Sequence, residues 1–209
     1  MKVSNPLNIR EKILKNTLVY RLSQNIVAPS SLGAQTVNDF LSTNHNSKIL
    51  DLGCGYGEIS QYFPSSCNYL GVDLNASYID YARQKHKRLN TEFIVGDVSD
   101  FDVANRGPFD LVFLTGVLHH LPSDQIKKLV ESSRALVSES GRFVAIEPVF
   151  DPDQSLIARL VIAADRGRYV RDVEGYESLL RVGFVKVSSI VDHSRLRIPY
   201  SHVIISCEH

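Results

Sequence analysis

The sequence predicts an α/β fold in which an open, mostly parallel sheet carries helices on both faces. Short apolar runs alternate with segments of helical periodicity along most of the chain, as parallel sheets require. A turn with glycine at every second position, Gly53, Gly55 and Gly57, joins the first run to the segment behind it, as in the strand–turn–helix units of open sheets. The last two runs have no helix between them, which indicates an antiparallel edge.

The expected elements follow in chain order. Two helices, at about residues 8–26 and 32–41, precede the first strand. The apolar runs place strands at about residues 48–52, 68–72, 92–95, 109–114, 143–146, 185–190 and 202–207. Connecting helices are expected at about residues 56–63, 76–89, 123–136 and 173–182, with Asn75 as an N-cap and Gly183 as a stop. Residues 149–172 form an insertion before the last helix.

Length and composition bound the class of protein. A chain of 209 residues can bury a substantial core, and we expect one domain over residues 1–209, with N-terminal helices within residues 1–42. The 23 basic and 23 acidic residues balance, so no broad basic surface favours nucleic acid. The three cysteines lack a C-x-x-C spacing, which fits a reducing compartment. Neither a secretory pattern nor a bilayer-spanning run is present, so the cytoplasm is the expected location.

The glycine turn predicts a ligand of the nucleotide type. Its pattern is Asp51-x-Gly53-x-Gly55-x-Gly57, not the G-x-G-x-x-G of dinucleotide sites. Glycines let a ligand lie against bare backbone. The carboxylate of Asp51 would repel a pyrophosphate but suits an ammonium group, such as that of S-adenosylmethionine. The alternative is a plain turn whose glycines occur by chance.

Two further acids lie where strands are expected to end. Asp73 follows the second strand, about twenty residues beyond Gly53, the spacing at which a carboxylate takes ribose hydroxyls. Asp97 follows the third strand and could accept a hydrogen bond from an exocyclic amine. Open α/β sheets bind ligands at this edge. The alternative for Asp73 is a helix cap, a role that Asn75 could fill instead.

Several segments together resemble the class I S-adenosylmethionine-dependent methyltransferases. They are Ile49 to Gly57, Gly71 to Leu74, Gly96 to Val98, Phe109 to Phe113, Val117 to Leu121 and Gly141 to Pro148. The resemblance implies a Rossmann-like seven-stranded sheet whose last strand is antiparallel. It implies S-adenosylmethionine as cofactor, bound by Asp51, Gly53, Cys54, Gly55, Asp73, Leu74, Asp97, Val98 and Thr115.

The family also suggests a role for each part of that set. The glycine turn and Asp51 would hold the methionine part, Asp73 the ribose, and Asp97 with Val98 the adenine, while Thr115 would offer its backbone near the methionyl amine. Cys54 is expected to be a small filler rather than a nucleophile. The N-terminal helices would fold over the cofactor or only cover the sheet edge; the sequence leaves both open.

His119 and His120 follow the fourth strand, whose end would face the transferred methyl group. Imidazole titrates near neutral pH and suits a general base, and we favour His120 over His119. The alternative is that one ring packs under the loop and the other is exposed. The stretch is not the Asn/Asp-Pro-Pro-Tyr/Phe pattern of amino-directed methyltransferases, and no acid-rich metal cluster is present.

The insertion predicts an acceptor with an anionic group. Its first part reads as a helix that is apolar on most of its surface and should be covered on more than one side. Arg168 and Arg171, with Tyr169 between them, could position a carboxylate or phosphate. The alternative is that these arginines are solvated or pair with neighbouring acids.

The sequence therefore predicts a methyltransferase acting on a small molecule, with transfer to oxygen expected. A second hypothesis is a module that binds S-adenosylmethionine without transferring methyl. A third is a nicotinamide-dependent oxidoreductase, which would need the third-glycine spacing that the turn lacks. The sequence gives neither the acceptor nor the oligomeric state.

Overall fold

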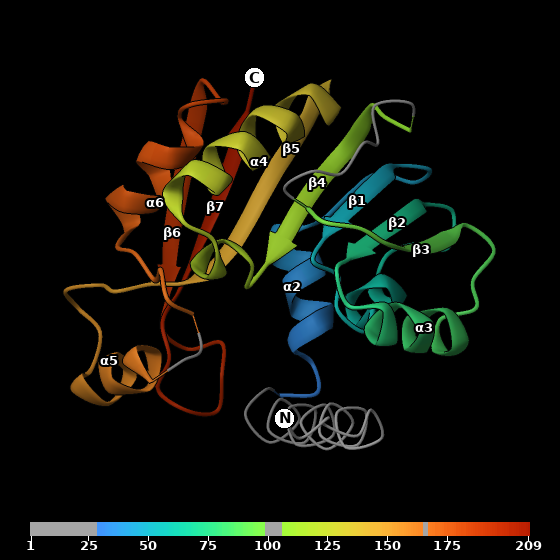
Figure 1. The fold of residues 1–209 in the computed structure, drawn as a ribbon. Helices are drawn as coiled ribbons and strands as arrows, with labels where there is room; N and C mark the ends of the chain where they lie inside the picture. Colours follow the sequence, from blue (N-terminus) through green and yellow to red (C-terminus); the bar gives the residue numbers. More distant parts are fainter. Residues whose placement is uncertain (1–28, 99–105, 165–166) are drawn as a thin grey trace, which may run out of the picture.

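The computed structural model describes residues 29–98, 106–164 and 167–209, and the helix expected at residues 8–26 lies outside them. The described strands form one sheet in the order β3-β2-β1-β4-β5-β7-β6 (Figure 1). Their bounds are β1 Lys48–Leu52, β2 Asn68–Asp73, β3 Thr91–Val95, β4 Phe109–Thr115, β5 Val137–Pro148, β6 Lys186–Asp192 and β7 His202–Glu208. The helices are α2 Leu32–Phe40, α3 Ala76–Lys85, α4 Ser123–Leu136, α5 Leu156–Ala163 and α6 Val173–Leu180, with short 3₁₀ helices η1 Glu58–Tyr62 and η2 Leu118–His120.

The sheet confirms the predicted fold class. Strands β1 to β5 pair in parallel, whereas β7 runs antiparallel to both of its neighbours, β5 and β6. Helices α3 and α4 follow β2 and β4 and lie in the long crossovers that parallel pairing needs, whereas the β6–β7 connection has no helix and permits an antiparallel pair. The sequence located this edge correctly because no helical period intervenes there.

Two hydrophobic clusters lie on the two faces of the sheet. One joins residues of α4 and α6 to inward-facing strand residues such as Val112 and Phe143. The other joins α2 and α3 to side chains such as Ile49 and Phe113. Both faces of the central strands are therefore covered, which explains why β1 and β4 read as nearly continuous apolar runs. The apolar stripe predicted for α4 is buried as expected.

Three elements differ from the sequence expectation. Instead of a helix over residues 56–63, the glycine turn leads into η1, which begins after Gly57 in a left-handed conformation at φ 70°. That piece ends before Pro64, and five residues are too few for an α-helix with free N-terminal amides aimed at a ligand. Helix α3 ends at Lys85 rather than near residue 89, and β5 is longer than predicted.

The insertion helix α5 stands away from the sheet (Figure 1). We expected it to be covered on more than one side, and this expectation is wrong: Leu156, Ile157 and Leu160 are 79%, 61% and 70% exposed. Only Ala158 and Ile162 of the helix are buried. The stretch is too apolar for its pattern to show which face packs inward. None of the helices in the described ranges has both the length and the apolar character needed to cross a bilayer.

Candidate active site

The glycine turn lies at the carboxyl end of β1 and is fixed to the next strand by backbone. The amides of Gly53 and Cys54 both donate to the carbonyl of Val72, at 2.7 and 2.9 Å. Gly53 and Gly55 have φ of 80° and 55°, values that side chains rarely tolerate. A Cβ on Gly53 would strike Val117, whereas one on Gly55 would meet nothing within 4 Å. Gly53 therefore allows close packing, and Gly55 leaves open space at the sheet edge.

Asp73 ties the turn to the end of β2. Its carboxylate accepts from the amide of Gly55 at 2.9 Å and from the amide of Asn75 at 2.8 Å. The cap of α3 is made by Asn75, whose side chain accepts from the amide of Ser77, so the predicted N-cap is confirmed. Each carboxylate oxygen of Asp73 accepts from one of these amides and has a further lone pair. The residue is only partly buried, and those lone pairs could take ribose hydroxyls.

Asp51 lies beneath the turn rather than on the open surface. It is 3% exposed, and its carboxylate accepts a short hydrogen bond from the hydroxyl of Tyr69 on β2. Burial raises the pKa of Asp51 to about 7, although the Tyr69 bond opposes the shift. Burial also raises the pKa of the Cys54 thiol, which keeps it protonated and agrees with a filler role. Tyr69 was not singled out in the sequence.

The remaining predicted cofactor residues line the open edge. Asp97 and Thr115 are exposed, Val98 is partly buried, and Leu74 is 70% exposed although it is apolar. The amide of Gly96 donates to the carbonyl of Asp73 at 3.0 Å, which keeps the ends of β2 and β3 together. The open space at Gly55, the remaining lone pairs of Asp73 and the uncovered Leu74 suit a ligand with hydroxyls and an apolar base. The chain thus fits S-adenosylmethionine at this edge.

The turn after β4 is organised by Glu147, a residue without a role in the sequence analysis. Its carboxylate is fully buried and accepts from the amides of Val117 and Leu118, both at 2.8 Å, and of His119 at 3.3 Å. It also lies 2.7 Å from Nδ1 of His119. The sequence does carry a signal for Glu147: an acid near the end of a buried apolar strand needs partners, because an unpaired buried charge is costly.

The two histidines have different environments. His119 is 5% exposed and held by Glu147, whereas His120 is exposed, and their ring centroids are 4.0 Å apart. Positions of a Cβ built on Gly116 and Gly167 lie 3.5 Å from Cε1 and 2.1 Å from Cδ2 of His119. The Nε2 atom, which lies between these ring carbons, therefore sits between two glycines. Because a carboxylate can only accept, Nδ1 of His119 is the donor to Glu147, and Nε2 would be the acceptor in the corresponding neutral tautomer.

The insertion packs against this histidine turn, but its arginines are not equivalent. The amide of Tyr169 donates to the carbonyl of His119 at 3.0 Å. Arg168 is exposed, and Tyr169 is 39% exposed. Arg171 instead donates to the carbonyls of Leu118, Tyr169 and Leu121 and to the hydroxyl of Ser123. Its fork is occupied by protein acceptors, so the structure does not present Arg171 to an anion as the sequence suggested.

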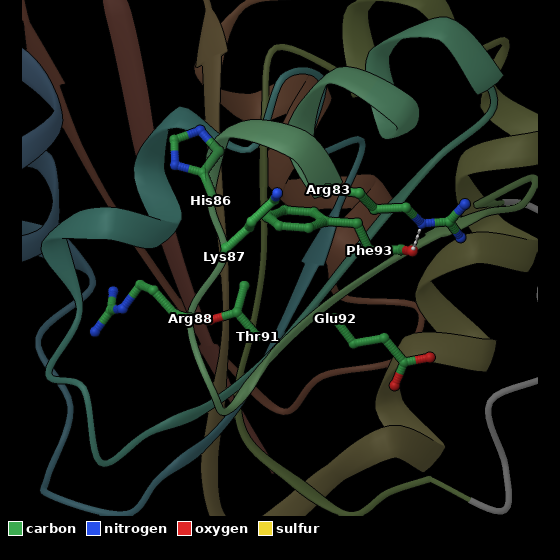
Figure 2. A pocket seen from close by; sticks show the side chains of 7 residues that line it. All are labelled: Arg83, His86, Lys87, Arg88, Thr91, Glu92 and Phe93. Carbon is green, nitrogen blue, oxygen red and sulfur yellow. Dashed lines mark hydrogen bonds between the residues drawn. The ribbon is translucent and has the colours of Figure 1, made fainter.

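A basic cavity of about 320 Å³ lies elsewhere, beside the start of β3 (Figure 2). It is lined by Arg83, His86, Lys87, Arg88, Thr91, Glu92 and Phe93. Arg88 donates to the carbonyls of Ser60 and Phe63 at 2.7 and 3.0 Å, and Nε of Arg83 donates to that of Phe93 at 2.8 Å. Both arginines therefore donate to backbone carbonyls of η1, of the residue after it and of β3. The cavity is at the opposite end of β3 from Asp97 and has no place in the site described above.

Comparisons with known proteins find methyltransferases. Residues 49–141 match a family model described as a methyltransferase domain. A fatty-acid O-methyltransferase of Mycolicibacterium smegmatis is 30% identical over 92 residues, covering 43% of this chain and 33% of that protein. A protein-L-isoaspartate O-methyltransferase of Shewanella amazonensis is 27% identical over 165 residues, covering 71% of each. The chain thus spans about a third of the length of the fatty-acid relative.

Solved structures show the same fold. A TehB-like S-adenosylmethionine-dependent methyltransferase from Corynebacterium glutamicum has a TM-score of 0.66 at 19% identity, over 98% of this chain and 100% of that one. Human N-acetylserotonin methyltransferase, in complex with S-adenosylmethionine, has a TM-score of 0.63 at 20% identity, over 86% and 51%. With its glycine turn, strand-end acids and sheet order, this chain is similar to the class I S-adenosylmethionine-dependent methyltransferases, and its residues 49–141 match a methyltransferase domain.

Proposed function

We propose that this protein transfers the methyl group of S-adenosylmethionine to an oxygen atom of a small-molecule acceptor. The observation that carries the proposal is the edge formed by Gly55, Asp73 and the His119–Glu147 pair, which joins a cofactor cradle to an oriented acceptor nitrogen. Two sequence relatives are named as O-methyltransferases, which supports oxygen as the accepting atom.

The cofactor residues proposed are those of the strand ends. Gly53 and Gly55 would face the methionine part, Asp73 the ribose hydroxyls, Asp97 and Val98 the base. Asp51 acts from below the turn, and a bound ammonium nearby would lower its raised pKa by favouring the carboxylate. S-adenosylmethionine would supply an electrophilic methyl group on a sulfonium, and the neutral leaving thioether needs no acid.

The chain's own chemical contribution is orientation and proton removal. We assign the base to His119 rather than His120, because the bond of its Nδ1–H to Glu147 would make Nε2 the nitrogen that accepts a proton from an acceptor hydroxyl. Orientation of the reacting groups supplies much of the remaining rate. Exposed Arg168 and Tyr169 are proposed to contact an anionic part of the acceptor.

A carboxylate acceptor is the second candidate. A fatty acid carries its reactive oxygens on a carboxylate, as the name of one relative suggests. Such an oxygen is already deprotonated and needs no base, and Arg168 offers it a cation. On this reading His119 would orient the acceptor rather than take a proton.

The experiment measures transfer of labelled methyl from S-adenosylmethionine into metabolite pools and into fatty acids. With a hydroxyl acceptor, we expect His119→Ala to lower turnover by roughly 10²–10⁴-fold, while His120→Ala, the matched control, changes it little. Unchanged turnover in His119→Ala with a hydroxyl acceptor would overturn the base assignment. Binding of the cofactor without transfer to any pool would favour a binding module instead.

A further inference from the structure

The turn that carries the histidines is held at both ends by charged side chains. At its start, Glu147 accepts from the amides of Val117, Leu118 and His119. At its end, Arg171 donates from Nη1 to the carbonyl of Leu118 at 3.4 Å and from Nη2 to that of Leu121 at 3.1 Å. An anion at the amide end and a cation at the carbonyl end of a helical turn both match the charge of the backbone groups there.

Arg171 is itself fixed by the insertion. Its Nη1 donates to the carbonyl of Tyr169 at 2.6 Å, and its guanidinium lies 5.8 Å from the ring centroids of both Tyr169 and Tyr176. Tyr176 is 1% exposed and donates to the carbonyl of Pro148 at 3.1 Å. A guanidinium that lies near two aromatic rings and is hydrogen-bonded in several directions has little freedom to swing toward solvent.

The backbone of Arg171 closes the insertion at its base. The amide of Phe150 donates to the carbonyl of Arg171 at 3.0 Å, and Val149 forms an isolated bridge with the same residue. Both ends of the insertion thus meet at Arg171. The guanidinium then reaches from this point to the histidine turn, so the position of the insertion and the position of His119 are mechanically linked.

We infer that Arg171 is a positioning residue that couples the seating of the insertion to the orientation of His119. The inference rests on the function proposed above and gives Arg171 a part in it other than anion binding. Lysine cannot replace it, because a single ammonium cannot reach acceptors on both sides of the turn as a planar fork does. Removal of the fork leaves Glu147 as the remaining charged anchor of the turn among the described residues.

The test compares Arg171→Lys and Arg171→Ala with Arg181→Ala, which removes an exposed arginine paired with Glu177 at 2.8 Å. Hydrogen exchange measures the protection of the amides of Val117 and Leu118. Nitrogen NMR measures the chemical shifts of the ring nitrogens of His119. Both measurements use the whole protein and need no acceptor. We expect exchange about tenfold faster in the two Arg171 variants, the effect of losing hydrogen bonds to a charged group, and an altered ring signal.

Two further readouts separate positioning from a general loss of stability. Affinity for S-adenosylhomocysteine should stay near that of the wild type, and low, non-denaturing guanidinium should restore the ring signal of Arg171→Ala. Wild-type exchange and ring signals in Arg171→Lys would overturn the inference, as would equal changes in Arg181→Ala. Altered ring signals in a protein that transfers no methyl would uphold the coupling while refuting the proposed function.

Discussion

In the half of the sheet formed by β1, β2 and β3, backbone groups shape the turn at the strand ends, whereas in the half formed by β4, β5 and β7 charged side chains hold the turn there. In the first half, glycines with positive φ and backbone amides shape the turn. The carboxylate of Asp73 accepts from the amides of Gly55 and Asn75, which are 18 and 2 residues away. In the second half, Glu147 and Arg171 hold the histidine turn from segments 28 to 53 residues away.

The first half is easier to infer from the sequence than the second. Local backbone requirements leave marks at fixed spacings, because only glycine accepts certain turns and acids recur at strand ends. Long-range charge pairing leaves no spacing to find. The two halves touch where the position of a Cβ on Gly53 would meet Val117 at 2.4 Å, so cofactor turn and histidine turn are packed together.

The largest expected effect comes from removing the buried anchor of the second half. Glu147→Ala would leave three amides without their acceptor and His119 without its partner, and we expect a loss of about 3–5 kcal/mol in the free energy of unfolding. Urea unfolding provides the measurement, with Glu139→Ala, an exposed acid on the same strand, as control. If both variants were equally stable, the second half would not depend on its charged anchor.

A smaller effect is expected from the buried acid of the first half. The pKa of Asp51 is raised from 3.8 to about 7, so its contribution to stability is complete below pH 4 and is lost as pH rises through 7. Between pH 5 and 8, the wild type should lose roughly 2 kcal/mol more stability than Asp51→Asn. Tyr69→Phe removes the bond that lowers this pKa and should move the loss to higher pH. Parallel stability curves for wild type and Asp51→Asn would contradict the burial argument.

Much of the fold could be predicted from the sequence. The glycine turn, the cap by Asn75, the apolar face of α4 and the antiparallel edge were predicted, because each depends on short-range pattern. The turn was nevertheless expected to open a regular helix, and η1 stands there instead. Turn chemistry fixed the backbone of Gly57, but the length of the next element depends on how it packs.

The site was predicted less completely. His119 and His120 were identified, but their ranking depended on Glu147, whose partners lie 28 to 30 residues away. Arg171 was recognised as a chemically capable residue, yet its acceptors are carbonyls that carry no sequence signal. The exposure of α5 was also missed, because an almost wholly apolar helix does not reveal which of its sides is covered.

Cofactor binding at the glycine turn is tested most directly by calorimetric titration of S-adenosylhomocysteine into the wild type, Asp73→Ala and Asp80→Ala. Asp80 is an exposed acid on α3 and serves as the matched control. We predict that the wild type and Asp80→Ala bind alike, and that Asp73→Ala binds at least about tenfold more weakly, which corresponds to about 1.4 kcal/mol. Equal affinity in a folded Asp73→Ala protein would contradict the placement of the cofactor at the glycine turn.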